Sequence, residues 1–200
     1  MKKTLIVFLM ILFVFIGYKF YYKDNKHFSS PATTIDFKHI NEVRKLVESN
    51  KRYNKRIAFF IDMKIVSGKN RFFVYDLKKN IIIDKGLVAH GSGSETGAKG
   101  KLKFSNVPNS LSTSLGKYYI GNSYYGKFGK AYKLYGLDKT NSNAFYRDIV
   151  FHYYFDVPYQ EQKGYICNSF GCPMVNKKYF ERTAKIIDDS DSNIVMSIYY

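Results

Sequence analysis

Short runs of β-branched and aromatic residues, separated by turn residues, constrain the fold of this chain most. The first three runs cover residues 56–64, 71–77 and 80–89, and turn residues occupy 67–70 and 78–80 between them. Such runs are typical of strands joined by tight turns. Aromatic residues make up 18% of the chain and are all Tyr or Phe, which suit a pleated surface better than a helix. We therefore expect one mainly β domain with a β-sandwich or barrel-like arrangement.

Two segments show helical spacing instead. Apolar residues recur at Phe37, Ile40 and Val43, with Asp36 available as a cap, and they predict a helix from about 34 to 50. A second amphipathic helix is expected over residues 176–188, followed by a last strand at 193–200. The tyrosine-rich segment 116–137, divided by glycines, predicts one or two hairpins.

The amino-terminal segment has the pattern of a membrane or export signal. Lys2 and Lys3 precede an apolar run at residues 5–17, and an extension to residue 22 approaches the roughly 20 residues that a bilayer core requires. No small-x-small cleavage site follows directly, which favours an uncleaved anchor over a cleaved signal. We expect a membrane segment at 1–22, a tether and helix at 23–55, and a globular domain at 56–200 outside the cytoplasm.

The charge distribution indicates an anionic neighbour. The formal net charge is +16, and residues 51–139 hold 18 basic and 5 acidic side chains. Such a field attracts anionic polymers or surfaces. The chain has no helix-turn-helix or RNP pattern, which argues against nucleic acid as a partner. With the amino-terminal segment, an anionic cell envelope is the expected partner.

The stretch from Asp148 to Val175 carries the clearest chemistry. A predicted strand ends near His152, and Gly171 and Cys172 follow about twenty residues later. A cysteine nucleophile requires a base that takes its proton, and imidazole is suited to that role. A glycine before the nucleophile lets backbone N–H groups turn toward an oxyanion. We therefore predict Cys172 as nucleophile, His152 as general base and then acid, and the N–H groups of Gly171 and Cys172 as oxyanion donors.

The cysteines and a glycine-rich loop also allow other roles. Cys167 and Cys172 are the only cysteines, and a disulfide between them is an open alternative, whereas a structural zinc site would need more ligands. The loop at residues 90–94 lacks the Gly-Lys-Ser/Thr ending of a nucleotide-binding loop. Its His90 has two open roles, a structural hydrogen bond or contact with substrate.

The segment S-F-G-C-P at 169–173, together with the preceding F-H, resembles the catalytic signature of murein L,D-transpeptidase (YkuD-like) domains. Further blocks that match one branch of this family, in the same order, lie at residues 88–94, 104–110, 114–118 and 136–144. The resemblance implies attack by Cys172 on a peptidoglycan tetrapeptide stem, release of D-alanine, and transfer of the acyl group to an amine. It implies no metal and no cofactor, a positioning or substrate role for Ser169, and a place for His90 in the cleft.

Two positions depart from the family pattern. Tyr153 stands where a small residue usually follows the histidine, and we expect its bulk to narrow the side where the acyl acceptor binds. The arginine that commonly follows the cysteine is absent, because the chain continues Pro173, Met174, Val175.

Three other functions stay open at the level of sequence. Water in place of the amine would make the chain an L,D-carboxypeptidase. A vestigial site would leave a membrane-anchored wall-binding scaffold. A basic surface-adhesion module would bind anions in a salt-sensitive way.

Overall fold

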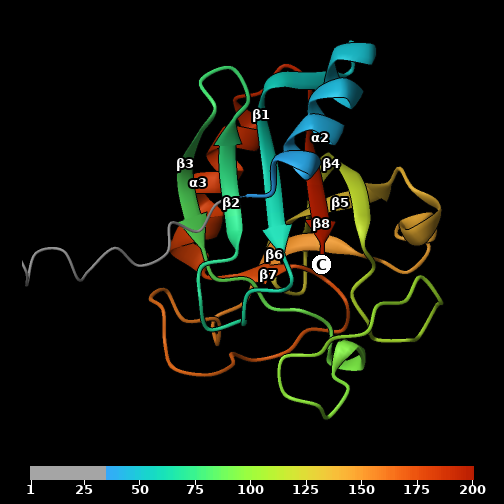
Figure 1. The fold of residues 1–200 in the computed structure, drawn as a ribbon, viewed down its shortest axis with the longest axis vertical. Helices are drawn as coiled ribbons and strands as arrows, with labels where there is room; N and C mark the ends of the chain where they lie inside the picture. The colour runs from blue at the N-terminus through green and yellow to red at the C-terminus, as the bar shows by residue number, and fades with distance from the viewer. Residues whose placement is uncertain (1–34) are drawn as a thin grey trace, which may run out of the picture. The chain divides into compact units, whose positions relative to one another are not determined.

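The computed structural model describes residues 35–200, which form a sheet with one helix in front of it and one behind (Figure 1). The predicted membrane segment at 1–22 lies outside the described residues, as does the tether up to residue 34. Within residues 35–200, no helix combines the length and the apolar character needed to cross a membrane.

The described residues contain two α-helices and eight strands. The helices are α2 (Phe37–Ser49) and α3 (Lys177–Asp188), and short 3-10 turns occur at η1 (Ser92–Ser94) and η2 (Lys139–Asn141). The strands are β1 (Tyr53–Asp62), β2 (Phe72–Asp76), β3 (Ile81–Gly86), β4 (Gly116–Gly126), β5 (Gly129–Gly136), β6 (Val150–Tyr153), β7 (Met174–Val175) and β8 (Asn193–Tyr199).

The predicted sandwich is wrong, because the described residues form one open sheet in the order β3-β2-β1-β8-β4-β5-β6-β7. The reason is the last strand. β8 pairs in parallel with β1 on one side and antiparallel with β4 on the other, so that it joins the amino-terminal meander to the β4–β5 hairpin. The three strands of the meander and this hairpin lie close to their predicted positions.

The two edges of this sheet meet at one point. Val88, just after β3, forms a bridge with Val175 of β7, and the Ala89 N–H donates to the Met174 carbonyl at 2.8 Å. The sheet is therefore curled. This curl corresponds in part to the expected barrel-like arrangement. This contact also brings the segment that contains His90 next to the strand after Cys172.

Both faces of the central strands are buried, and each face has its own helix. Phe59 and Phe72 pack with Tyr179 of α3, whereas Phe60 and Phe73 pack with Val43 of α2. All four phenylalanines are fully buried, and burial of each such side chain contributes about 1.5–3 kcal/mol. The centre of the sheet is thus a firm support for β6, which carries His152.

Both predicted helices are confirmed, as is the predicted cap of the first. The Asp36 side chain accepts a hydrogen bond from the Lys38 N–H at the start of α2, and Asn176 does the same for Lys178 at the start of α3. Because α3 begins directly after β7, this cap also fixes where the chain turns after Cys172.

Candidate active site

Pairing of β6 with β7 brings Cys172 beside the strand that carries His152. The two strands are parallel, with His152 opposite Met174. Cys172 precedes Met174 by two residues and therefore lies beside the start of β6. Its thiol accepts a hydrogen bond from the Val150 N–H at 3.4 Å and lies 3.6 Å from the Asp148 carbonyl.

His152 is held in one tautomer by the main chain. Its Nδ1 lies 3.0 Å from the Tyr153 carbonyl, and a carbonyl only accepts, so Nδ1 carries the proton. The Phe128 ring stacks on the imidazole, with centroids 5.4 Å apart. Nε2 makes no hydrogen bond to any of residues 35–200 and keeps its lone pair for a proton. The Tyr153 carbonyl therefore fixes the orientation of the His152 ring.

Burial sets the resting charges of the pair. It raises the pKa of the Cys172 thiol, against smaller opposing effects of the Val150 N–H, Arg147 and Lys133. It lowers the pKa of the His152 imidazole, against the effect of the Tyr153 carbonyl. Both shifts favour the neutral thiol with the neutral imidazole. No hydrogen bond joins the two side chains within the described part of the chain, and such contacts commonly tighten only when substrate binds.

The loop before Cys172 requires a glycine. Gly171 has φ +118°, and a Cβ there would lie 2.9 Å from the Ser112 carbonyl oxygen and 3.0 Å from Ile149 Cδ1. The Gly171 N–H donates to Ser169 Oγ at 3.1 Å. The Cys172 N–H has no such partner among residues 35–200, so of the two N–H groups it is the one left free to donate to a bound oxygen atom.

Ser169 is a buried residue that ties the loop to the chain around His90. Its N–H donates to the His90 carbonyl and its carbonyl accepts from the Ser92 N–H, both at 2.8 Å. The Gly91 N–H in turn donates to Thr113 Oγ1 at 2.9 Å. Hydrogen bonds thus join the chain at Ser169, three residues before Cys172, to the segments at residues 90–92 and 113.

The His90 side chain has a structural place. Only 1% of it is exposed, and both ring nitrogens are bonded: Arg71 donates to Nδ1 at 2.9 Å, and Nε2 donates to Glu95 at 2.7 Å. Burial and the nearby Arg71 charge lower the pKa of His90. Of the two roles considered for this ring, the structure therefore shows the structural hydrogen bond. The main chain of His90, and not its ring, contacts the loop that precedes Cys172.

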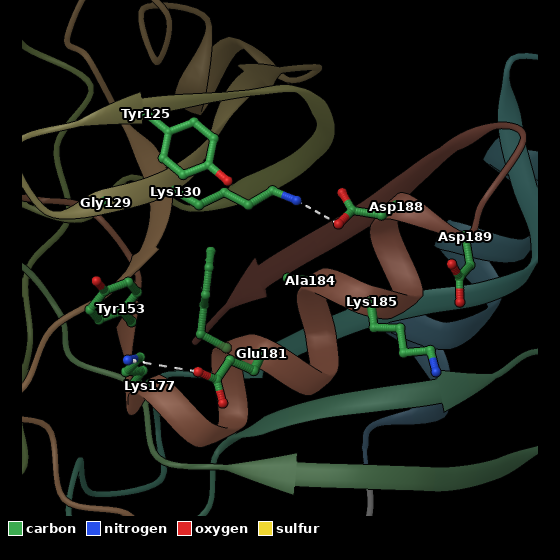
Figure 2. A pocket seen from close by; sticks show the side chains of 11 residues that line it. Tyr125, Gly129, Lys130, Tyr153, Lys177, Glu181, Ala184, Lys185, Asp188 and Asp189 are labelled. Atoms are coloured by element: carbon green, nitrogen blue, oxygen red, sulfur yellow. Dashed lines mark hydrogen bonds and ion pairs between the residues drawn. The ribbon is translucent and has the colours of Figure 1, made fainter.

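The structure places Tyr153 away from Cys172, contrary to the expectation that it narrows the acceptor side. Successive strand residues point to opposite faces, so Tyr153 points toward α3, where its ring lies 5.6 Å from Phe180. It lines a pocket of about 440 Å³ between the β4–β5 hairpin and α3, as Figure 2 shows. His152 lies on the other face of β6.

Arg147 is a residue of the site that sequence reasoning missed. Its guanidinium donates to the carbonyls of Ser105 and Ser112 and to the hydroxyls of Ser110 and Ser114, at 2.6–3.3 Å. It thereby holds the serine-rich loop against Gly171. The available signal was a lone arginine in a polar segment just before the histidine strand.

The remaining sequence expectations concern thiols and metals. Cys167 and Cys172 are both free thiols, so the structure does not contain the disulfide considered as an alternative. Within residues 35–200, no group of three or more His, Cys, Asp or Glu side chains is arranged to hold a metal ion.

Comparison with known proteins identifies related domains. A family model described as an L,D-transpeptidase catalytic domain (YkuD_2) matches residues 26–199. No curated protein gives a significant match.

Three solved structures are similar to part of this chain. The helical cell shape determining protein Pgp2 from Campylobacter jejuni is 13% identical over 72% of this chain and 47% of its own, with a TM-score of 0.46. The Ldtfm-avibactam carbamoyl enzyme is 9% identical over 74% of this chain and 50% of its own, with a TM-score of 0.45. An L,D-transpeptidase from Xylanimonas cellulosilytica is 14% identical over 72% of this chain and 60% of its own, with a TM-score of 0.38. The chain spans about half the length of the first two.

Proposed function

Because this chain belongs to the L,D-transpeptidase catalytic domain family, we propose that it crosslinks peptidoglycan stem peptides through a thioester on Cys172. The observation that carries the proposal is the contact of the Cys172 thiol with the start of β6, the strand that presents His152 with Nδ1 bonded and Nε2 open. A nucleophile beside a base with a fixed tautomer is the arrangement that acyl transfer requires.

The first half of the reaction forms the thioester. His152 Nε2 takes the thiol proton as the sulfur attacks the carbonyl of the L,D peptide bond in a tetrapeptide stem. The negative charge moves to the carbonyl oxygen, where the Cys172 N–H donates to it. The imidazolium then protonates the nitrogen of the leaving D-alanine, and the C–N bond breaks.

The second half transfers the acyl group. An amine of another stem attacks the thioester, His152 takes the amine proton, and the thiol returns to Cys172 as the new amide forms. The neutral resting pair suits this cycle, because the imidazole must be a base at the start of each half. The same steps with water as acceptor would make the enzyme an L,D-carboxypeptidase.

The test uses the full chain with purified disaccharide-tetrapeptide muropeptides and reads the products by mass spectrometry. Wild type is compared with Cys172→Ala and with Cys167→Ala, a matched control that removes the other thiol. We expect a crosslinked dimer from wild type and from Cys167→Ala but not from Cys172→Ala. Shortened tripeptide alone would indicate the carboxypeptidase. Untouched substrate with a free, reactive Cys172 thiol would favour the wall-binding scaffold or the adhesin.

The site of action follows from residues 1–22 and from the charge. We propose that the apolar run anchors the chain in the membrane, with the domain outside the cytoplasm facing an anionic envelope. Protease treatment of intact cells tests this: we expect loss of residues 35–200, and their survival until the membrane is broken would contradict it.

A further inference from the structure

Lys133 of β5 lies on the face of the sheet that carries the nucleophile. Antiparallel pairing places Ala131 opposite His152 and Lys133 opposite Val150. Residues paired directly across two strands share a face. Lys133 and His152 therefore point to the same side, away from α3, and the Val150 N–H beside Lys133 is the group that contacts the Cys172 thiol.

Asp148 connects Lys133 to the nucleophile. Lys133 Nζ lies 3.2 Å from Asp148 Oδ1, and the carbonyl of the same Asp148 lies 3.6 Å from the Cys172 sulfur. Lys133 and Cys172 thus contact the same residue, the first through its side chain and the second through its main chain. The rings of Tyr124 and Phe145 flank it, with centroids 5.0 and 5.6 Å from Nζ.

The ion pair that holds Lys133 is easily exchanged. The Asp148 side chain is 84% exposed and that of Lys133 is 30% exposed, and exposed pairs of this kind contribute about 0–1 kcal/mol. Arg147, the other cation near the thiol, has both terminal nitrogens engaged with the serine loop. Lys133 is therefore the positive group near Cys172 that a ligand anion can recruit.

We propose that Lys133 binds the terminal carboxylate of the donor tetrapeptide stem and so selects stems that end in a free D-alanine. The proposal rests on the proposed function, in which the bond attacked by Cys172 is one residue from that carboxylate.

The test measures binding, so that it does not depend on turnover. In a Cys172→Ala background, the affinity of the muropeptide tetrapeptide is compared by calorimetry with that of the same peptide carrying a carboxy-terminal amide. We expect the free acid to bind about tenfold more tightly, as for a charge-assisted hydrogen bond. Addition of Lys133→Met should reduce this preference to about onefold.

Lys130→Met is the matched control. Lys130 lies on the same strand and also pairs with a carboxylate, that of Asp188, but it points to α3 (Figure 2). The variant loses the same charge and should keep the tenfold preference. Asp148→Asn frees Lys133 at a position with φ +53°, which asparagine tolerates, and should give a preference at least as large as the parent's.

Several results would overturn the proposal. They are equal affinity of acid and amide in the parent, no binding of the free acid, a preference that survives Lys133→Met, or a smaller preference in Asp148→Asn. Failure of the proposed function is seen separately, as absence of a thioester on the wild-type chain, and leaves these binding results unaffected.

Discussion

Arg71 is the buried charge on which the loops around the site depend most, and its removal gives a sharp prediction. Its guanidinium is 1% exposed and makes four hydrogen bonds: two to the Val88 carbonyl at 2.9 and 2.7 Å, one to the Ile65 carbonyl at 3.2 Å, and one to His90 Nδ1 at 2.9 Å. Arg71→Met keeps much of the side-chain volume but leaves three acceptors without their donor.

The magnitude follows from those acceptors. Each buried polar group left unpaired costs about 1–3 kcal/mol, and the burial of an apolar side chain in place of a charge offsets part of the sum. We expect the free energy of unfolding to fall by about 3–5 kcal/mol. The Cys172 loop should also loosen, because His90 holds Ser169 through its carbonyl.

Urea denaturation, monitored by tyrosine fluorescence, measures the change in the free energy of unfolding. The dependence of that free energy on urea concentration should be the same for wild type and variant. Arg52→Met is the control, because Arg52 is exposed and the same substitution there should change the free energy by less than about 0.5 kcal/mol. A loss below about 1 kcal/mol in Arg71→Met would refute the reasoning that these hydrogen bonds hold the loops.

Three further predictions concern the site. Burial lowers the pKa of His152 from its ordinary 6.5, and the base must be neutral to act. The rate of Cys172 acylation should therefore rise with pH to a plateau, with its midpoint below pH 6.5. A midpoint above pH 6.5 in the rate–pH profile would contradict the neutral resting pair. Gly171→Ala forces a Cβ to 3.0 Å from Ile149 Cδ1 at φ +118°, a strain of about 1–3 kcal/mol, and stopped-flow acylation should slow about 10- to 100-fold, whereas an unchanged rate argues against a role for the loop geometry. Cys167→Ala should leave kcat/KM within about twofold of wild type in the muropeptide assay, and a larger loss would assign that thiol a role.

Local patterns in the sequence predicted the local elements well. The helices at 37–49 and 177–188 and the strands of the meander follow from spacing and caps that involve neighbouring residues only. The insertion of β8 between β1 and β4 pairs β8 with residues of β1 more than 130 positions away, as in Phe59 with Met196, and with residues of β4 more than 70 positions away, as in Tyr119 with Val195. No local pattern encodes that pairing, which explains why the sequence predicts a sandwich and the structure has a single sheet.

The site divides in the same way. Cys172, His152 and Gly171 were predicted from one stretch of sequence, and the structure brings the thiol to the strand of the histidine. The position of Tyr153 could have been predicted, since the residue after His152 in a strand must face the other side. The roles of Arg71 and Arg147 depend on carbonyls of distant loops, and no sequence spacing indicates them.

A thioester on Cys172 is the central claim, and intact-protein mass spectrometry tests it most directly. The wild-type chain is quenched in acid during reaction with tetrapeptide muropeptide and then mapped by proteolysis. We predict an acyl adduct on Cys172 that lacks the terminal D-alanine, that is unaffected by Cys167→Ala, and that is absent in His152→Ala. An adduct on Cys167, or no adduct on a chain whose Cys172 reacts with iodoacetamide, would contradict the account.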